Sequence, residues 1–291
     1  MTQFDIIVPT YNRAKELPFF FERNSALQSA YVHVWIVDDC SPHFDSSVIP
    51  LWPNLTLIRL EKNKGQAFAR NVAIEKGNAP FIISLDDDAW FENVPRSLEQ
   101  IEQFFNDYPD AGCQMFNIAT PNSFYSNMES GTLLALHVTC GCAYRRQIIT
   151  GIGGFSEFLH SGAEETDLSI RIYQANSSIR FINEIKVFHN FNPAYRSLTW
   201  YRNVRYNTTR NDLLIVLMTY PILLVIPFVL GKFISHLRFA IAYRYKVRRT
   251  FLVTMWAFVG FLLLSPKAIE KRNPLTWLQF RHWRGLLKNG L

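Results

Sequence analysis

Three consecutive carboxylates, Asp86, Asp87 and Asp88, directly follow the apolar run Phe81–Leu85. Carboxylates at this spacing repel one another, so the cluster favours a site that holds a cation. A hard divalent ion such as Mg²⁺ or Mn²⁺ takes oxygen ligands and can bridge to phosphate groups. The triplet therefore indicates a metal site, and a solvated acidic turn is the alternative that it leaves open on its own.

Three further polar segments also follow apolar runs. Residues 9–13 (Pro-Thr-Tyr-Asn-Arg) follow the first run, residues 38–41 (Asp-Asp-Cys-Ser) the second and residues 63–71 the third. They offer an aromatic ring for a base, a carboxylate for an imide N–H, and an arginine for a base or phosphate. Each segment alone is also compatible with a turn or a helix cap. Beside the Asp triplet, they favour a nucleotide site.

The apolar runs of the first half alternate with helical patterns. Helices are predicted at residues 14–29, Gln66–Lys76 and Val94–Tyr108. Such alternation predicts βαβ units and an α/β fold with a mostly parallel central sheet. Ligands of open α/β sheets bind beyond the carboxyl ends of the strands, where these polar segments lie. The predicted strands are Phe4–Val8, Val32–Val37, Leu55–Leu60 and Phe81–Leu85.

The pattern of residues 112–190 is less regular. A helix is predicted from Glu164 to Gln174, and the glycines at 151, 153 and 154 mark a turn or loop before it. Strands are predicted at Gly112–Ile118, His137–Tyr144, Ile179–Ile182 and Ile185–Phe188.

The charge is divided unevenly along the 291 residues. Residues 1–199 carry 15 lysines and arginines against 22 aspartates and glutamates, whereas residues 200–291 carry 15 against two. This division predicts a catalytic domain over residues 1–199 and a basic, apolar helical region for membrane association over residues 200–291. The long uncharged runs of the second region favour a membrane surface and argue against nucleic acid as a partner.

Two uncharged runs dominate the second region. Leu213–Leu230 has eighteen residues, which is the lower limit for a membrane-spanning helix, but Pro221 and Pro227 would kink or split it. Phe251–Leu264 has fourteen residues and is predicted to be too short to span. Basic residues lie between the runs, at 238, 244, 246, 248 and 249. We therefore favour helices lying in the membrane interface over an inserted hairpin or ordinary core helices.

The N-terminus and the cysteines favour the cytoplasm. The strand-like run Phe4–Val8 is too short for the apolar part of a signal peptide. The four cysteines, Cys40, Cys113, Cys140 and Cys142, have neither a disulfide framework nor the spacing of a zinc knuckle, so we expect reduced thiols. Together with the basic tail, this predicts a peripheral or monotopic protein on the cytoplasmic face of the cell membrane.

The order and spacing of these segments over residues 4–190 resemble the family-2 glycosyltransferases of the GT-A fold. The resemblance implies an inverting, metal-dependent enzyme whose donor is a nucleoside-diphosphate sugar. It implies that Asp88 binds the metal and that Asp86 contacts the ribose or base and also takes part in the metal site. Asp38 is the alternative to Asp39 for the contact with the base. The residues that it implies around the nucleobase are Pro9, Thr10, Tyr11, Asp39 and Arg70.

Later segments also resemble that family. Residues 141–146 are similar to its segment beside the donor sugar, and residues 153–155 to its acceptor-side loop. Residues 162–171 are similar to its acidic motif, whose second acidic residue acts as general base. That residue is usually Asp, whereas Glu165 stands here, and Glu164 is the other candidate for the base. Asp167 and Arg171 lie four apart on the predicted helix, which favours a structural ion pair.

His189 ends a predicted strand, and by the resemblance it can coordinate the metal or the diphosphate, with a structural role as the alternative. The residues after it form a polar patch before the apolar run, which could hold phosphates of a lipid acceptor or cap helices. The patch comprises Arg202, Asn203, Arg205, Arg210 and Asn211.

These observations predict transfer of a sugar to a glycan, or to a lipid-linked glycan, in the synthesis of cell-surface polysaccharide. The cofactor is a divalent cation, Mn²⁺ or Mg²⁺. Neither the donor, the acceptor nor the oligomeric state follows from the sequence. A non-catalytic, membrane-bound protein that binds nucleotide sugars or glycans is the alternative, but both acidic motifs are present. A nucleotidyltransferase would need a glycine-rich N-terminal phosphate loop, where residues 9–12 stand instead.

Overall fold

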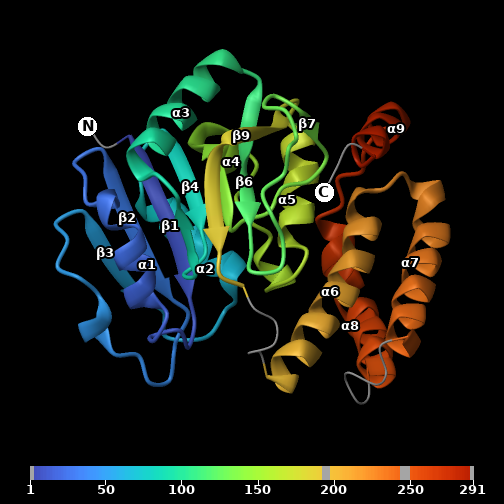
Figure 1. The fold of residues 1–291 in the computed structure, drawn as a ribbon. Helices are drawn as coiled ribbons and strands as arrows, with labels where there is room; N and C mark the ends of the chain where they lie inside the picture. The colour runs from blue at the N-terminus through green and yellow to red at the C-terminus, as the bar shows by residue number, and fades with distance from the viewer. Residues whose placement is uncertain (1–2, 192–196, 243–249, 289–291) are drawn as a thin grey trace.

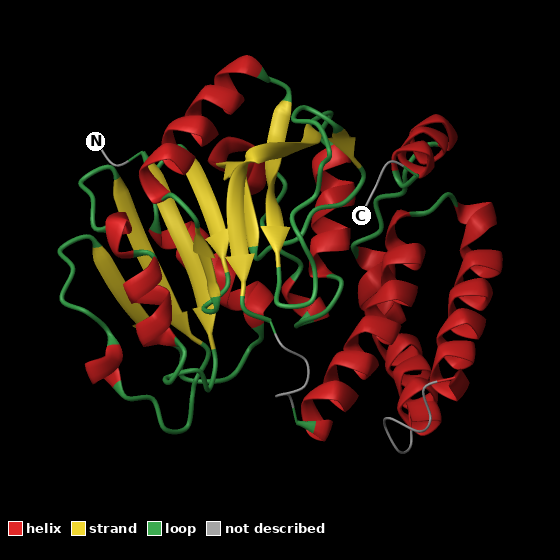
Figure 2. Cartoon of the chain, viewed as in Figure 1, coloured by secondary structure: helices red, strands yellow, loops and turns green. Residues whose placement is uncertain are grey.

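A mixed β-sheet between helices forms the first two thirds of the chain, and a group of helices lies beside it in the last third (Figures 1 and 2). The structure is a computed structural model that describes residues 3–191, 197–242 and 250–288. The basic residues predicted near the membrane at positions 244–249 lie outside the described residues.

The strands are arranged in the order β3-β2-β1-β4-β8-β6-β9-β5, and β7 pairs with β9. The first four strands along the chain pair in parallel, whereas β8 runs antiparallel to both β4 and β6. The parallel strands therefore end at one edge of the sheet. The bounds are β1 Phe4–Thr10, β2 Val32–Asp38, β3 Leu55–Arg59, β4 Phe81–Leu85, β5 Ala89–Phe91, β6 Ala111–Ala119, β7 Leu133–Leu134, β8 Gly141–Arg145 and β9 Ser178–His189.

Helices cover both faces of the sheet. Side chains of α1 (Leu17–Arg23) and α3 (Val94–Asp107) pack on one face in a core that includes Phe4, Ile6 and Val8 of β1. The other face, with Ile7 of β1, packs against helices α2 (Gln66–Lys76), α4 (Arg146–Gly151) and α5 (Glu164–Gln174). Burial of both faces explains why β1 reads as a continuous apolar run.

The predicted elements are confirmed for the most part. The predicted bounds of Gln66–Lys76, Phe81–Leu85 and Glu164–Gln174 agree with those of α2, β4 and α5. The helix expected over residues 14–29 instead ends at Arg23 and is followed by a 3₁₀ turn, Ser25–Leu27. The cause is the buried Asn24, whose side-chain amide donates to Phe20 O in the last turn of α1 and to Ala89 O in β5, at 3.1 Å each.

Two strand predictions were wrong in detail. The strand predicted from His137 begins only at Gly141, because both ring nitrogens of His137 are engaged by the side chains of Ser169 and Tyr144. The two strands predicted at 179–182 and 185–188 form one strand, β9. The residues between the two predicted strands are part of β9, and its pairing with β6 shifts in register there.

The last third consists of α6 (Leu198–Thr219), α7 (Ile222–Ala242), α8 (Thr250–Glu270) and α9 (Trp277–Leu286). Their buried side chains form a third core that also includes Leu159 and Ile170 of the sheet domain. The predicted break at Pro221 is confirmed, since α6 ends at Thr219 and α7 begins at Ile222. The prediction that the run from Phe251 is too short to span was wrong, because α8 continues through Pro266 to Glu270.

Both α7 and α8 are long and apolar enough to cross a membrane. Each has 21 residues, and the most apolar stretch of each has a mean hydropathy of 1.7. Within that stretch, 6% of the residues of α7 and 28% of those of α8 are buried. A 21-residue helix is about 32 Å long, close to the roughly 30 Å of a bilayer's hydrocarbon core. Their outward side chains include Ile222, Leu223, Ile226, Leu230, Trp256, Leu262 and Leu263.

Candidate active site

A cavity of about 640 Å³ lies at the edge of the sheet where the parallel strands end. The segments after β1, β2 and β4 form one side of it, and the first half of α6 forms another. The cavity brings together seven of the residues predicted for the site: Pro9, Thr10, Tyr11, Asp39, Asp86, Asp88 and His189. Four others are outside the lining: Asp38, Arg70, Glu164 and Glu165.

Asp87, the middle member of the Asp triplet, binds the segment after β1. One of its carboxylate oxygens accepts a hydrogen bond of 2.7 Å from Thr10 Oγ1, and the other lies 3.3 Å from Arg13 Nε. Burial raises the pKa of Asp87 to about 7 despite the opposing charge of Arg13. Asp87 therefore fixes the loop after β1 against the loop after β4, and it also forms part of the cavity wall with its two neighbours.

Asp86 is held by a buried arginine, Arg70 of α2. Arg70 Nη2 lies 2.6 Å from Asp86 Oδ1, and Arg70 Nε donates to Ser84 Oγ at 3.2 Å. The side chain of Arg70 is fully buried, so it acts on the site through Asp86 and not by direct contact with the cavity. Its Nη1 has no hydrogen-bond partner.

Asp88 and His189 form the second half of this cluster. His189 Nε2 lies 3.0 Å from Asp88 Oδ1 and 3.7 Å from Asp86 Oδ2, and Arg13 pairs with the other oxygen of Asp88. Burial opposes the charged imidazole, but the hydrogen bonds to Asp88 and Cys140 and the nearby Asp86 raise the pKa of His189 to about 11. Two carboxylates thus converge on one positive group. This donor set suits a divalent cation, and Asp86, Asp88 and His189 would hold it.

Asp39 and Asp38 point in different directions after β2. The Asp39 carboxylate accepts hydrogen bonds from the backbone N–H of Lys64 at 2.7 Å and of Gly65 at 2.8 Å, at the rim of the cavity. Asp38 is buried and instead accepts hydrogen bonds from Ser41 and from Arg59 Nε, at 3.1 Å for the latter. Asp38 therefore organises the loop, whereas Asp39 lies where a ligand could reach it.

Glu164 and Glu165 begin α5 behind Gln66, a residue of the cavity wall. Glu164 is fully buried, and the side-chain amide of Gln66 donates to it. Burial and the neighbouring Glu165 raise the pKa of Glu164 to about 8, so this group is mostly protonated at neutral pH. Burial also raises the pKa of Glu165, which is partly exposed and interacts with Arg70 and Asp86. A carboxylate with a raised pKa near the cavity is suited to accept a proton.

The predicted ion pair of Asp167 with Arg171 is confirmed. Arg171 Nη2 lies 2.7 Å from Asp167 Oδ2, which also accepts a 2.6 Å hydrogen bond from Ser156. The expected acceptor-side loop lies close by, since Gly153 and Phe155 line a second cavity of about 470 Å³. Two lysines of the last third, Lys267 and Lys271, also line this cavity.

Helix α6 holds the loop between Leu159 and Gly162, which leads into α5. The amide of Asn211 donates to Leu159 O at 2.9 Å and Ser161 O at 3.0 Å, and Arg210 Nη2 donates to Leu159 O at 2.9 Å. The predicted polar patch is therefore divided. Asn211 binds only the protein among the described contacts, Asn203 lines the cavity, and Arg210 does both.

Sequence reasoning assigned no role to four residues at this site: Arg13, Gln66, His160 and Cys140. Arg13 and Gln66 lie within segments that were noted for other residues, so only the fold shows what they touch. The backbone of His160 contacts Gly65. A glycine is needed at position 65 for two reasons: its φ of +89° is rarely adopted by other residues, and an added Cβ would overlap the His160 carbonyl oxygen.

Similarity to known proteins agrees with this geometry. The sequence profile of the family described as Glycosyl transferase family 2 matches residues 5–158. An uncharacterized glycosyltransferase of Haemophilus influenzae is 30% identical over 218 residues, which are 67% of this chain and 70% of that protein. The uncharacterized glycosyltransferase YwdF of Bacillus subtilis is 25% identical over 177 residues, which are 55% of this chain and 64% of that protein.

Solved structures share the fold. S. aureus TarS 1–349 in complex with UDP-GlcNAc has a TM-score of 0.61 at 18% identity, over 99% of this chain and 89% of that chain. The mannosyltransferase PcManGT from Pyrobaculum calidifontis, in complex with GDP-Man and Mn²⁺, has a TM-score of 0.58 at 16% identity, over 98% and 84%. The expected GT-A arrangement of an α/β sheet domain with C-terminal helices is confirmed.

Proposed function

Because the chain belongs to glycosyl transferase family 2 and uses nucleotide sugars, we propose the following reaction. The enzyme transfers the sugar of a nucleoside-diphosphate donor, with inversion, to a hydroxyl of a lipid-linked glycan. The observation that carries the proposal is the cavity of about 640 Å³ at the ends of β1, β2 and β4. Its lining combines groups suited to a base, Tyr11 and Asp39, with the cluster of Asp86, Asp88 and His189 suited to a cation.

In this proposal, the donor lies along the strand ends. Tyr11 and Asp39 contact the base, because they are the aromatic ring and the acceptor carboxylate on the cavity wall. Asp86, Asp88 and His189 hold a divalent cation beside the diphosphate, and when bound the cation neutralises charge on the leaving group. Arg70 fixes the position of Asp86, and Arg13 does the same for Asp88.

Glu165 is the proposed general base. It takes the proton of the acceptor hydroxyl as that oxygen attacks the anomeric carbon, which inverts the configuration in a single displacement. Its partial exposure and raised pKa support this role, whereas Glu164 is fully buried and hydrogen-bonded to Gln66. Glu164 then serves to position the start of α5.

A phosphate-bearing acceptor is supported by the second cavity. Its lining combines the loop at Gly153 and Phe155 with the cationic side chains of Lys267 and Lys271. Lys267 belongs to α8 and Lys271 directly follows it, and α8 is one of the two helices whose outward apolar side chains are exposed. We propose that α7 and α8 bind the cytoplasmic face of a membrane, where a lipid-linked acceptor in polysaccharide synthesis would be available.

The test is a panel of nucleotide sugars with Mn²⁺ or Mg²⁺, with release of nucleoside diphosphate and transfer to a lipid-linked glycan extract as readouts. Asp88→Asn should abolish transfer, and Glu165→Gln should reduce it by about 10²–10⁴-fold. The matched control is Asp110→Asn, because Asp110 pairs with Arg180 at 2.9 Å and lies outside the cavity lining. Transfer lost or reduced in this way in the first two variants and kept in the control would support the proposal.

Two results would overturn it. Metal-dependent donor binding without transfer or hydrolysis would favour a binding protein. Equal transfer to a soluble sugar without lipid would remove the case for a lipid-linked acceptor.

A further inference from the structure

A thiol lies beside the carboxylates and the imidazole of the candidate metal site. The sulfur of Cys140, a carboxylate oxygen of Asp86 and a ring nitrogen of His189 all lie within 4.8 Å of one another. The sheet explains why residues so distant in sequence meet. Leu85 at the end of β4 pairs with Gly141 at the start of antiparallel β8, and His189 ends β9 beside Ala89 of β5.

The spacing of these atoms fits one cation. Bonds from a transition metal to carboxylate oxygen, imidazole nitrogen and thiolate sulfur are about 2.0 to 2.3 Å, so ligand atoms on opposite sides of an ion lie up to roughly 4.5 Å apart. No two of the three atoms are more than 4.8 Å apart, so at most small side-chain movements bring them around one ion. Asp88 Oδ1, 3.0 Å from His189 Nε2, can join them as a fourth ligand.

We propose that Cys140 is a sulfur ligand of the metal at this site, and that it makes the enzyme bind divalent transition metals in preference to Mg²⁺. This proposal rests on the proposed function for the identity of the site, but it concerns the selectivity for the ion. Thiolate and imidazole donors favour ions such as Co²⁺ and Zn²⁺, whereas Mg²⁺ prefers oxygen ligands in octahedral geometry. On binding, the metal–sulfur bond replaces the S–H bond and the proton goes to solvent.

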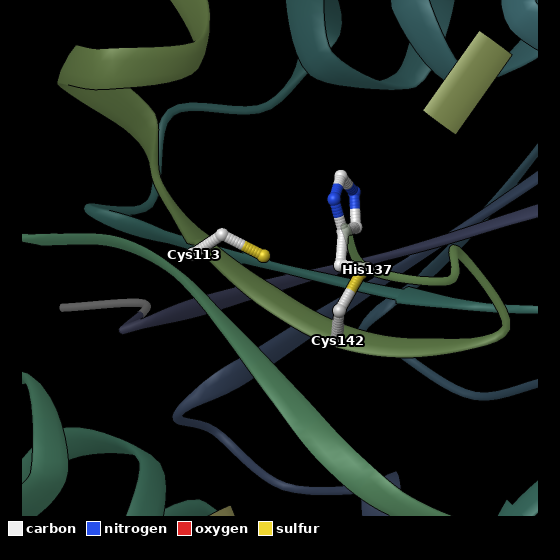
Figure 3. A group of neighbouring side chains, drawn as sticks. All are labelled: Cys113, His137 and Cys142. Atoms are coloured by element: carbon white, nitrogen blue, oxygen red, sulfur yellow. The ribbon is translucent and has the colours of Figure 1, made fainter. Parts of the chain in front are cut away.

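A second thiol and imidazole group among the described residues is a less suitable site. Cys113, His137 and Cys142 lie together inside the sheet domain (Figure 3), and all three are buried. His137 Nδ1 is 2.7 Å from Ser169 Oγ and its Nε2 is 2.7 Å from Tyr144 OH, so both nitrogens already have partners. The group also contains no carboxylate, and it therefore serves as an internal control.

The experiment is titration of the full-length, metal-free protein with Co²⁺ without any donor. A thiolate ligand gives a sulfur-to-cobalt charge-transfer band in the near ultraviolet, which reports metal binding independently of catalysis. Calorimetry with Co²⁺ and with Mg²⁺ gives the preference. The variants are Cys140→Ser and, as the matched control, Cys113→Ala, and thermal unfolding verifies that each is folded.

The wild type and Cys113→Ala should show the band. Cys140→Ser should lose it and bind Co²⁺ at least about tenfold more weakly, with little change in Mg²⁺ affinity. A band that persists in Cys140→Ser or disappears in Cys113→Ala would overturn the proposal, as would equal wild-type affinity for both ions.

The two proposals can fail separately. A Cys140-dependent band in a protein that transfers no sugar would sustain the metal ligand and refute the proposed function. Sugar transfer by the wild type, together with unchanged Co²⁺ binding in Cys140→Ser, would support the proposed function and refute Cys140 as a metal ligand.

Discussion

The side-chain amide of Asn211, in the middle of α6, lies 2.9 Å from the backbone carbonyl of Leu159 in the loop before α5. It also reaches the next part of that loop at Ser161 O, at 3.0 Å. Asn211 is fully buried, so its amide makes these hydrogen bonds shielded from solvent. The helix that begins the last third of the chain therefore fixes the entrance to the acidic motif.

Asn211→Ala should lower turnover more than donor affinity. It removes the donor to Ser161 O and one of the two donors to Leu159 O, which costs about 1–3 kcal/mol of stability, and a small displacement of Glu165 would lower turnover by about tenfold or more. Steady-state kinetics beside calorimetric donor binding measures both. Asn54→Ala is the control, because the Asn54 amide likewise donates to backbone carbonyls, those of Leu27, Ser29 and Val32, but lies outside the cavity lining. Equal losses in the two variants would contradict this role for Asn211.

Glu165→Gln should reduce turnover by about 10²–10⁴-fold while donor binding persists, because it removes a proton acceptor and keeps the shape of the side chain. Glu165→Asp should retain part of the activity, since a carboxylate remains. Rapid-mixing measurement of donor turnover separates these outcomes from changes in binding. Normal turnover in Glu165→Gln with loss in Glu164→Gln would transfer the role of base to Glu164.

Glu164→Gln should make the metal-free protein more stable above pH 8. The pKa of Glu164 is about 8 in the folded chain against an ordinary value of 4.5, because burial and Glu165 disfavour the carboxylate. The folded state thus keeps a proton that the unfolded chain releases. This contribution to stability is complete below pH 4.5 and is lost as the pH rises through about 8.

The measurement is thermal unfolding of Glu164→Gln and wild type from pH 5 to pH 9. Glutamine keeps the oxygen that accepts from Gln66, so the two proteins should be alike at low pH and diverge as the pH rises. A constant difference between their melting temperatures across this range would show that Glu164 does not titrate there.

Gly260→Ala should destabilise the contact between α8 and α6. An added Cβ would overlap the hydroxyl of Tyr206 and lie 3.3 Å from Arg210 Cδ, and such overpacking typically costs about 1–3 kcal/mol. Gly231→Ala on α7 is the control, because no atom lies within 4 Å of its added Cβ. Unfolding in detergent should show a loss for the first variant and none for the second. Equal melting temperatures would refute tight packing at Gly260.

Lysines on the outward face of α7 should weaken membrane binding. Leu223 and Ile226 are 75% and 71% exposed, and a double change of both to lysine places charge where we propose lipid contact. Flotation with vesicles that contain anionic lipid measures the bound fraction, which should fall sharply. Leu51→Lys is the control, since Leu51 is fully exposed on the sheet domain. Unchanged flotation of the α7 variant would contradict membrane contact through this face.

The meeting of Thr10, Asp86 and Asp88 could be predicted from the sequence. Each follows or ends an apolar run, and parallel strands end at one edge of a sheet, so local patterns sufficed. The helix starting at Glu164 was equally predictable, because two acidic residues precede an apolar periodicity.

Other features depend on contacts that periodicity does not report. Asn24 ends α1 through bonds to a strand 65 residues away, and Asn211 binds a loop about 50 residues earlier. A polar residue in an amphipathic pattern looks alike whether it faces water or a buried carbonyl. For the same reason the sequence predicts that the apolar run from Phe251 ends before Pro266. In the structure α8 continues past Pro266, and its side chains pack with those of α6 in one core.

The arrangement of His189 between Asp86 and Asp88 has a consequence for ion binding. The imidazole, whose pKa these neighbours raise, is a positive group that the chain itself supplies, so the carboxylates are partly neutralised before any ion arrives. At the proposed metal site, binding of an ion would then be an exchange of the imidazole proton for the metal. Such an exchange weakens as the pH falls, because protons compete for the same nitrogen.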